Sequence, residues 1–285
     1  MGLGIVHLAD LHWDTTFAQA PTRWESLRQS LCVMHPDLIV VSGDLTSTGS
    51  AQPAALRAVK QALDAMGCEY IVLAGNHDLG ANPEREQTFP GTEAYERVPW
   101  ASTHFAQVFH QPPVLRWSQD GVHVITVSIR QGDPDGSLAQ LTATLQALEG
   151  PTMVFGHYPL VPIAAQGPLA HFGGREYLGA TLDQLAAVLA RFPHVVFYGC
   201  GHVHVASRRW LWGNTWQYSA GSLGLGASQF FVYLVEDTQL AYFSVLGNGP
   251  LTFWDAAGPE PVNHFDEDAS RVGCHRWRDN SRQEV

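Results

Sequence analysis

The sequence predicts an α/β fold, a four-layer α-β-β-α sandwich of two mixed sheets flanked by helices. Over residues 1–200, short apolar runs alternate with amphipathic segments, which is typical of βα units around parallel strands. In residues 114–129 and 214–247, strand-like runs follow one another without a helix and indicate a second, largely antiparallel sheet. Two sheets packed face to face, with helices outside, would bury the long apolar runs on both sides.

Five continuous apolar runs are the predicted parallel strands, because such runs suit strands that are buried on both faces. They are GIVHLA (4–9), DLIVVS (37–42), YIVLA (70–74), TMVF (152–155) and HVVFYG (194–199). Residues 114–129 differ, because Asp120 and Gly121 are a hairpin turn pair between two alternating runs. Residues 214–247 contain three further strand-like runs.

Three amphipathic segments between these strands are the predicted helices, and each opens with a residue type that caps helices. They are 50–67 with Ser50 as the cap, 137–150 with Ser137 as the cap, and a helix that opens with Thr181 and Gln184 at capping-box spacing.

The chain changes character near residue 255, where it becomes polar and mixed in charge. We expect one domain over residues 1–254 and a polar C-terminal tail or arm over residues 255–285. Such a tail would cover either the site or a partner subunit in a homo-oligomer, and the sequence does not choose between the two.

The composition is that of an ordinary globular chain, with 45% hydrophobic and 15% charged residues. The formal net charge is −11 and the basic residues are scattered, so we expect no extended nucleic acid as a partner. No apolar run approaches the roughly 20 residues of a membrane span, and the first ten residues do not resemble a secretory signal. We therefore expect a soluble, cytoplasmic protein with no membrane association.

Every predicted parallel strand delivers an Asp, Asn or His just past its carboxyl end, the edge at which an open α/β sheet binds its ligand. These residues are Asp10, His12, Asp44, Asn76, His77, Asp78, His157, His202 and His204. A one-residue gap on extended backbone would point both members of each D-x-H or H-x-H pair to one face. Glycines before several of these residues would let the backbone pass close to a crowded ionic centre.

Carboxylate, imidazole and amide ligands together suit divalent metals such as Mn, Fe or Zn, and these residues are too many for one ion. Two ions roughly 3.5 to 4 Å apart that share one carboxylate are the arrangement used for in-line displacement at phosphorus. The sequence therefore predicts a dinuclear metal site.

Three residues near these motifs have separate interpretations. His7 lies inside the first predicted strand, and we expect a hydrogen-bonded core histidine there instead of a ligand. Trp13 and Tyr158 each follow a predicted ligand, so they would either line the pocket or pack in the core.

The motifs D-x-H, G-D, G-N-H-D, G-H and G-H-x-H, in this order between residues 10 and 204, resemble the calcineurin-like metallophosphoesterase family. Their spacing looks like that of its class III cyclic-nucleotide and glycerophosphodiester phosphodiesterase branch. The resemblance implies two ligand sets that share Asp44 as a bridge. They are Asp10, His12 and His204 for one ion, and Asn76, His157 and His202 for the other. It also implies that His77 is catalytic without being a ligand, and we expect Asp78 to orient it.

The implied cofactors are two divalent or mixed-valence metal ions, drawn from Mn, Fe and Zn. The implied function is hydrolysis of a small phosphodiester, a cyclic nucleotide or similar, by attack of a metal-bound hydroxide. Two alternatives stay open at this point. One is a phosphomonoesterase that acts on nucleotides or phosphoproteins, and the other is a catalytically silent metal-binding scaffold.

Overall fold

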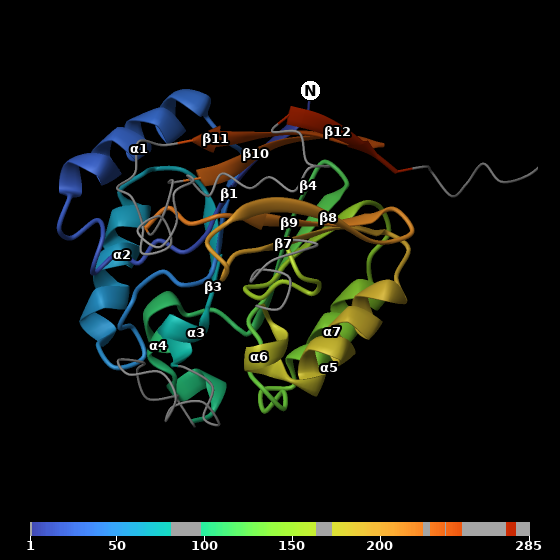
Figure 1. Cartoon of the computed structure of the whole chain (residues 1–285), viewed down its shortest axis with the longest axis horizontal. Coiled ribbons are helices and arrows are strands. Elements are labelled where there is room, and N and C mark those ends of the chain that lie inside the picture. Colours follow the sequence, from blue (N-terminus) through green and yellow to red (C-terminus); the bar gives the residue numbers. More distant parts are fainter. Residues whose placement is uncertain are drawn as a thin grey trace, which may run out of the picture.

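The computed structural model describes six stretches of the chain. They are residues 2–80, 98–163, 173–224, 229–236, 238–246 and 272–277. Within these stretches, two six-stranded sheets pack face to face, and helices cover both outer faces (Figure 1). This arrangement confirms the predicted four-layer sandwich of two mixed sheets.

The first sheet contains three of the five predicted parallel strands. Its strands are β1 (Leu3–Leu8), β2 (Leu38–Ser42), β3 (Tyr70–Leu73), β10 (Gln229–Glu236), β11 (Gln239–Leu246) and β12 (Val272–Arg276). They lie in the order β12-β11-β10-β1-β2-β3, with β1, β2 and β3 parallel and the other pairs antiparallel. The described part of the predicted C-terminal arm is therefore an edge strand of this sheet.

The second sheet contains the other two predicted parallel strands. Its strands are β4 (Val114–Gln119), β5 (Val122–Val127), β6 (Thr152–Phe155), β7 (Val195–Cys200), β8 (Ala206–Trp212) and β9 (Thr215–Ala220). They lie in the order β4-β5-β6-β7-β9-β8, and only the two edge pairs are antiparallel. The expectation of a largely antiparallel second sheet was wrong, because β10 and β11 follow β9 in the chain but belong to the first sheet, where β10 pairs with β1 and β11 pairs with β10. The predicted hairpin is confirmed, with positive φ at both Asp120 and Gly121.

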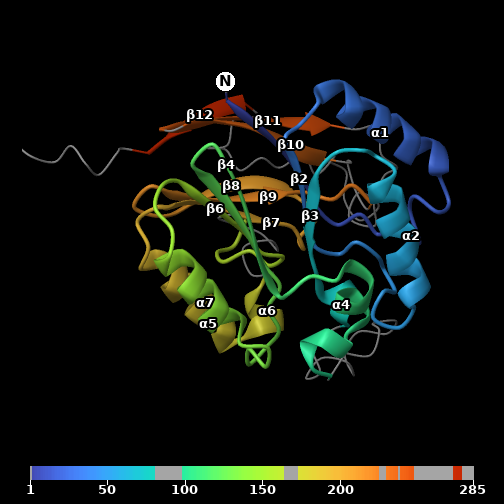
Figure 2. The same ribbon diagram turned by 180° about the vertical axis from the view of Figure 1, so that it is seen from behind.

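Each sheet has its own covering helices. On the first sheet lie α1 (Pro21–Met34), α2 (Pro53–Asp64) and α4 (His104–Phe109), and on the second lie α5 (Ser137–Gln146) and α7 (Ala180–Ala190). The view from behind shows the same layers (Figure 2). Three short elements complete the described chain: α3 (Asn76–Leu79), α6 (Arg175–Leu178) and the 3-10 turn η1 (Trp100–Ser102). Among the described residues, no helix has the length and apolar character of a membrane span.

The three predicted helices are confirmed as α2, α5 and α7, but their predicted caps were wrong. The residues at the N-cap positions are Gln52, Gly136 and Gly179. The hydroxyl of Ser137 instead donates to the backbone oxygen of Ser128, and the hydroxyl of Thr181 accepts from the backbone N–H of Gly132. Both side chains connect their helix to the loop after β5.

The residues of β1 show how the core is divided. Ile5 lies between the two sheets, whereas Val6 and Leu8 pack against the helices, as alternation along a strand requires. His7 is fully buried, and its Nε2 lies 2.8 Å from the hydroxyl of Ser42. Burial lowers the pKa of His7 to about 3, so this imidazole is neutral. His7 is confirmed as a hydrogen-bonded core histidine.

Candidate metal centre

The loops that follow β1, β2, β3, β6 and β7 bring the predicted ligands together. Two groups form, and within each group the candidate ligand atoms all lie within 4.8 Å of one another. One group is Asp10, His12, Asp44 and His204, and the other is Asp44, His157 and His202. Asp44 belongs to both groups.

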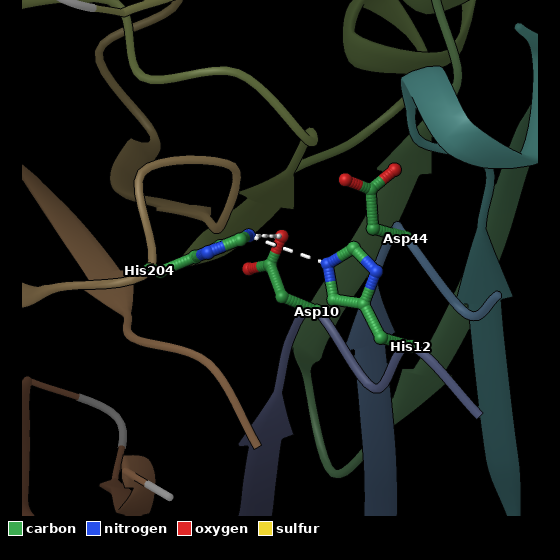
Figure 3. Close-up of side chains that lie close together, drawn as sticks. All are labelled: Asp10, His12, Asp44 and His204. Carbon is green, nitrogen blue, oxygen red and sulfur yellow. Dashed lines mark hydrogen bonds and ion pairs between the residues drawn. The ribbon is translucent and has the colours of Figure 1, made fainter. Parts of the chain in front are cut away.

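The first group has the spacing of ligands around one ion (Figure 3). Nε2 of His204 lies 3.3 Å from Nε2 of His12 and 3.4 Å from Oδ1 of Asp10. Oxygen and nitrogen ligands about 2.0 to 2.2 Å from one ion, at bond angles near 90 to 110°, are themselves roughly 3 to 3.5 Å apart. The donor types and the distances therefore both fit a divalent metal.

The second group has the same spacing, and Asn76 joins it. Nε2 of His157 lies 3.3 Å from Oδ2 of Asp44 and 3.0 Å from Oδ1 of Asn76. The same amide oxygen lies 3.0 Å from Nδ1 of His202. These residues supply a carboxylate, an amide oxygen and two imidazoles, a set that suits Mn, Fe or Zn.

The backbone of the predicted ligands is left-handed at most positions. Five of the seven have positive φ angles: Asp10 (52°), His12 (45°), Asp44 (47°), His202 (71°) and His204 (59°). The expectation that the D-x-H and H-x-H pairs converge from extended backbone was therefore wrong, because tight turns beyond the strand ends direct these side chains inward. Such strained conformations are uncommon outside glycine and cluster at functional sites.

Two glycines make room for the carboxylates. A Cβ added to Gly75 would lie 2.2 Å from Oδ1 of Asp44, and one added to Gly201 would lie 2.4 Å from Oδ2 of Asp10. Both carboxylates are buried, so neither can swing away into solvent. This confirms the expectation that glycines let the backbone approach a crowded centre.

The charges within the centre are tightly linked. Burial alone would lower the pKa of His157, but the carboxylates of Asp44 and Asp10 and the backbone oxygen of Ser42 together outweigh burial and raise that pKa to about 9. Burial alone would raise the pKa of Asp44, but the imidazoles of His157 and His77 hold it well below its usual range. Burial and neighbouring imidazoles lower the pKa of His12 and of His202, so both are neutral and able to bind a metal.

The two predicted catalytic residues lie on α3, directly after β3. The backbone N–H of His77 donates to Oδ1 of Asp44 at 2.9 Å, and its Nδ1 lies 3.1 Å from the backbone oxygen of Ser47. The buried carboxylate of Asp78 accepts from the backbone N–H groups of Leu45, Thr46 and Gly75 and from the hydroxyl of Thr46. Asp78 therefore ties the Asp44 loop to α3. Burial and the Asp44 carboxylate raise the pKa of Asp78 to about 7.

The two aromatic residues that follow predicted ligands differ in their surroundings. Trp13 packs edge-on against Trp24, with ring centroids 4.9 Å apart, so it belongs to the core between helix and sheet. Tyr158 borders the centre, because its ring lies 4.9 Å from those of His157 and His202. Sequence reasoning missed Tyr177 of α6, whose ring lies 4.4 Å from that of His202.

Comparison with known proteins gives a family and several relatives. Residues 3–206 match the family described as Calcineurin-like phosphoesterase. A probable glycerophosphodiester phosphodiesterase GpdQ of Arcobacter nitrofigilis is 26% identical over 206 residues, which cover 67% of this chain and 67% of that protein. A probable cyclic nucleotide phosphodiesterase of Synechococcus sp. is 29% identical over 224 residues, 72% of this chain and 75% of that protein. For a GpdQ of Enterobacter lignolyticus, 28% identical over 180 residues, the match covers 59% of this chain and 56% of the relative.

Solved structures share the fold. A dimetal phosphatase from Danio rerio has a TM-score of 0.64 at 11% identity, over 97% of this chain and 99% of that one. A purple acid phosphatase from yellow lupin has a TM-score of 0.59 at 11% identity, over 95% of this chain and 57% of that one. Identity this low shows the fold alone. The family match, however, runs from the first residue of β1 to the first of β8, which is well over half of the chain. The chain therefore belongs to the calcineurin-like phosphoesterase family and is a hydrolase that acts on phosphate esters.

Proposed function

We propose that this protein is a dinuclear metal-dependent phosphodiesterase that hydrolyses a small diester. The observation that carries the proposal is the pair of ligand groups that share Asp44. One ion would be held by Asp10, His12 and His204, and the other by Asn76, His157 and His202. When bound, the ions would supply positive charge for the phosphate and lower the pKa of bound water toward neutrality.

The charge balance of the centre favours an anionic substrate. The two ligand carboxylates, Asp10 and Asp44, offset only part of the charge of about +4 that two divalent ions bring. The pocket would then be locally positive although the chain has a formal net charge of −11. A phosphate ester would bind there for this reason, and an acidic surface elsewhere would not prevent it.

His77 is the proposed catalytic acid. It is partly exposed, unlike the buried ligands beside it, and Ser47 and Asp44 hold its ring and backbone. A cationic imidazole here would stabilise the developing charge on the phosphate or protonate the departing oxygen. The proposed role of Asp78 is indirect, because its carboxylate fixes the loop and helix on which Asp44 and His77 lie.

The names of the relatives support a diester as the substrate. Two are named as glycerophosphodiester phosphodiesterases and one as a probable cyclic nucleotide phosphodiesterase. The test compares bis(p-nitrophenyl) phosphate with p-nitrophenyl phosphate, after metal quantification and with added Mn. We expect about two ions per chain and a preference for the diester. A strong preference for the monoester would instead support the alternative phosphomonoesterase.

A catalytically silent scaffold is the third possibility, and His77 separates it from an enzyme. The His77→Ala variant should lose roughly 10²- to 10⁴-fold in turnover while it keeps its metal ions, because the imidazole is not a proposed ligand. His123, on β5 and hydrogen-bonded to Ser118, provides the matched control. The His123→Ala variant should keep full activity. A wild-type protein that binds ions but never turns over either ester would favour the scaffold.

The identity of the metals, a cytoplasmic location, the division of the chain near residue 254 and a homo-oligomeric state stay predictions from the sequence.

A further inference from the structure

We infer that Ser47 is a positioning residue that fixes the protonated nitrogen of two histidines of the centre, His12 and His77. Its effect on metal binding rests on the proposed function, whereas the proton assignment does not. Ser47 lies in the loop after β2, three residues beyond Asp44, and no motif of the sequence marks it.

All three polar groups of Ser47 are engaged. Its backbone N–H donates to the carboxylate of Asp14 at 2.6 Å, and its backbone oxygen lies 3.1 Å from Nδ1 of His77. Its hydroxyl lies 2.9 Å from Nδ1 of His12 and 2.9 Å from the hydroxyl of Thr15. The carboxylate of Asp14 also accepts from the hydroxyl of Thr48, which anchors the loop a second time.

The hydroxyl of Thr15 sets the direction of the hydrogen bonds around His12. Thr15 donates its only hydroxyl proton to the backbone oxygen of His12 at 3.0 Å, since a carbonyl oxygen can only accept. Toward Ser47, the Thr15 oxygen can therefore act only as an acceptor. Ser47 therefore donates its own hydroxyl proton to the Thr15 oxygen. The hydroxyl oxygen of Ser47 must then accept from Nδ1 of His12.

This closed circuit places the proton of neutral His12 on Nδ1 and its lone pair on Nε2. Nε2 is the atom that lies 3.3 Å from Nε2 of His204, in the first ligand group. A histidine that binds a metal through Nε2 needs this tautomer, and a partner on the other nitrogen typically fixes it. The circuit of His12, Ser47 and Thr15 thus prepares His12 as a ligand.

Ser47 also fixes the protonated nitrogen of His77, in this case through its backbone oxygen. The carbonyl of Ser47 can only accept, so Nδ1 of His77 carries a proton in either charge state. Nε2 would then be the atom that meets the leaving oxygen of the substrate. One loop, held by Asp14, therefore fixes the protonated nitrogen of both the proposed ligand His12 and the proposed acid His77.

The direct test is the tautomer of His12 in metal-free protein labelled with ¹⁵N-histidine at pH 8. Long-range ¹H–¹⁵N correlation spectra distinguish a protonated Nδ1 from a protonated Nε2. We expect both His12 and His77 to be protonated at Nδ1. In Thr15→Val, the Ser47 hydroxyl loses its acceptor and turns its proton toward His12, so His12 should shift to the Nε2-protonated form. His77 should not change, because the carbonyl of Ser47 remains.

Metal affinity gives the second readout, by titration with Mn. Loss of a partner that orients a metal-binding histidine typically costs about 10- to 100-fold in affinity, and we expect this loss in both Ser47→Ala and Thr15→Val. Ser118 makes a matched control, because its hydroxyl also lies 2.9 Å from Nδ1 of a histidine, His123, outside the centre. Ser118→Ala should bind Mn as the wild type does.

Two results would overturn the inference. One is a wild-type His12 protonated at Nε2, and the other is an unchanged Mn affinity in both Ser47→Ala and Thr15→Val. A wild-type protein that binds no Mn would defeat the proposed function instead, and the spectra of the metal-free protein would still decide the tautomer of His12.

Discussion

Replacement of Gly75 by alanine tests how closely the fold sets the position of Asp44. Gly75 joins β3 to α3 with a φ of −97°, a backbone conformation open to every residue type. The substitution therefore adds only a methyl group, which would lie 2.2 Å from Oδ1 of Asp44 and 2.5 Å from its backbone nitrogen. Ordinary contact begins at 3.4 Å, so Asp44 would have to retreat by about 1 Å.

A shift of this size in the shared ligand should be costly. Misplacement of a catalytic group by about 1 Å costs on the order of 100-fold in rate, so we expect kcat/KM for bis(p-nitrophenyl) phosphate to fall by about that factor. Overpacking should also cost about 1 to 3 kcal/mol in the free energy of unfolding. The assays are steady-state kinetics with Mn, metal content per chain and urea unfolding.

Gly4→Ala is the matched control, because a Cβ at Gly4 in β1 would meet no atom closer than 3.5 Å. This variant should match the wild type in all three assays. The reasoning would be refuted if Gly75→Ala kept two ions per chain and wild-type kcat/KM. In that case the position of Asp44 would not matter for metal binding or for catalysis, and the proposal that Asp44 is the shared ligand would be contradicted.

Three further predictions concern buried titratable side chains. Asp44→Asn should reduce bound Mn from about two ions per chain to one or none, as metal analysis would show, because both ligand groups lose the same carboxylate; two retained ions would contradict the shared role. His7 is neutral when folded, with a pKa of about 3. As pH falls from 6.5, only the unfolded chain gains this proton. The contribution of His7 to the free energy of unfolding is therefore complete above pH 6.5 and is lost progressively toward pH 3. Urea titrations at pH 7 and at pH 4 measure how much unfolding free energy each protein loses between the two. The His7→Gln variant should lose about 3 kcal/mol less than the wild type, and an equal loss in the two proteins would contradict this. Arg130→Met should cost about 3 to 5 kcal/mol in unfolding free energy, because it leaves the buried Asp135 without its ion-pair partner, and a cost below 1 kcal/mol would contradict this.

The strands and the predicted ligands could be located from sequence because their signals are local. An apolar run such as DLIVVS, followed by Gly43 and Asp44, identifies both a buried strand and the residue at its end. The assignment of strands to sheets is not local. The strand-like runs β9 and β10 are neighbours in sequence, yet β9 pairs with β7 in one sheet and β10 pairs with β1 in the other.

The partners of several hydroxyl side chains were not predictable from the sequence. Ser137 and Thr181 stand where a sequence pattern expects caps, but tertiary partners use their hydroxyls. Ser47 and Thr15 stand at no expected position, and yet they lie against His12. A hydroxyl bonds to whatever acceptor or donor the fold places near it, and residue type alone does not encode that choice.

The strained turns of the centre persist because its loops hold one another. The backbone N–H of Asp10 donates to the oxygen of Gly43 at 3.0 Å, and that of His12 donates to the oxygen of Asp44 at 3.1 Å. The backbone N–H of His202, from the second sheet, donates to the Asp10 carboxylate of the first sheet at 3.0 Å. Each such bond contributes about 1 kcal/mol, comparable to the cost of one left-handed residue. Because these bonds join the ligand loops of both sheets, each left-handed turn is held by a neighbouring loop as well as by its own segment of the chain.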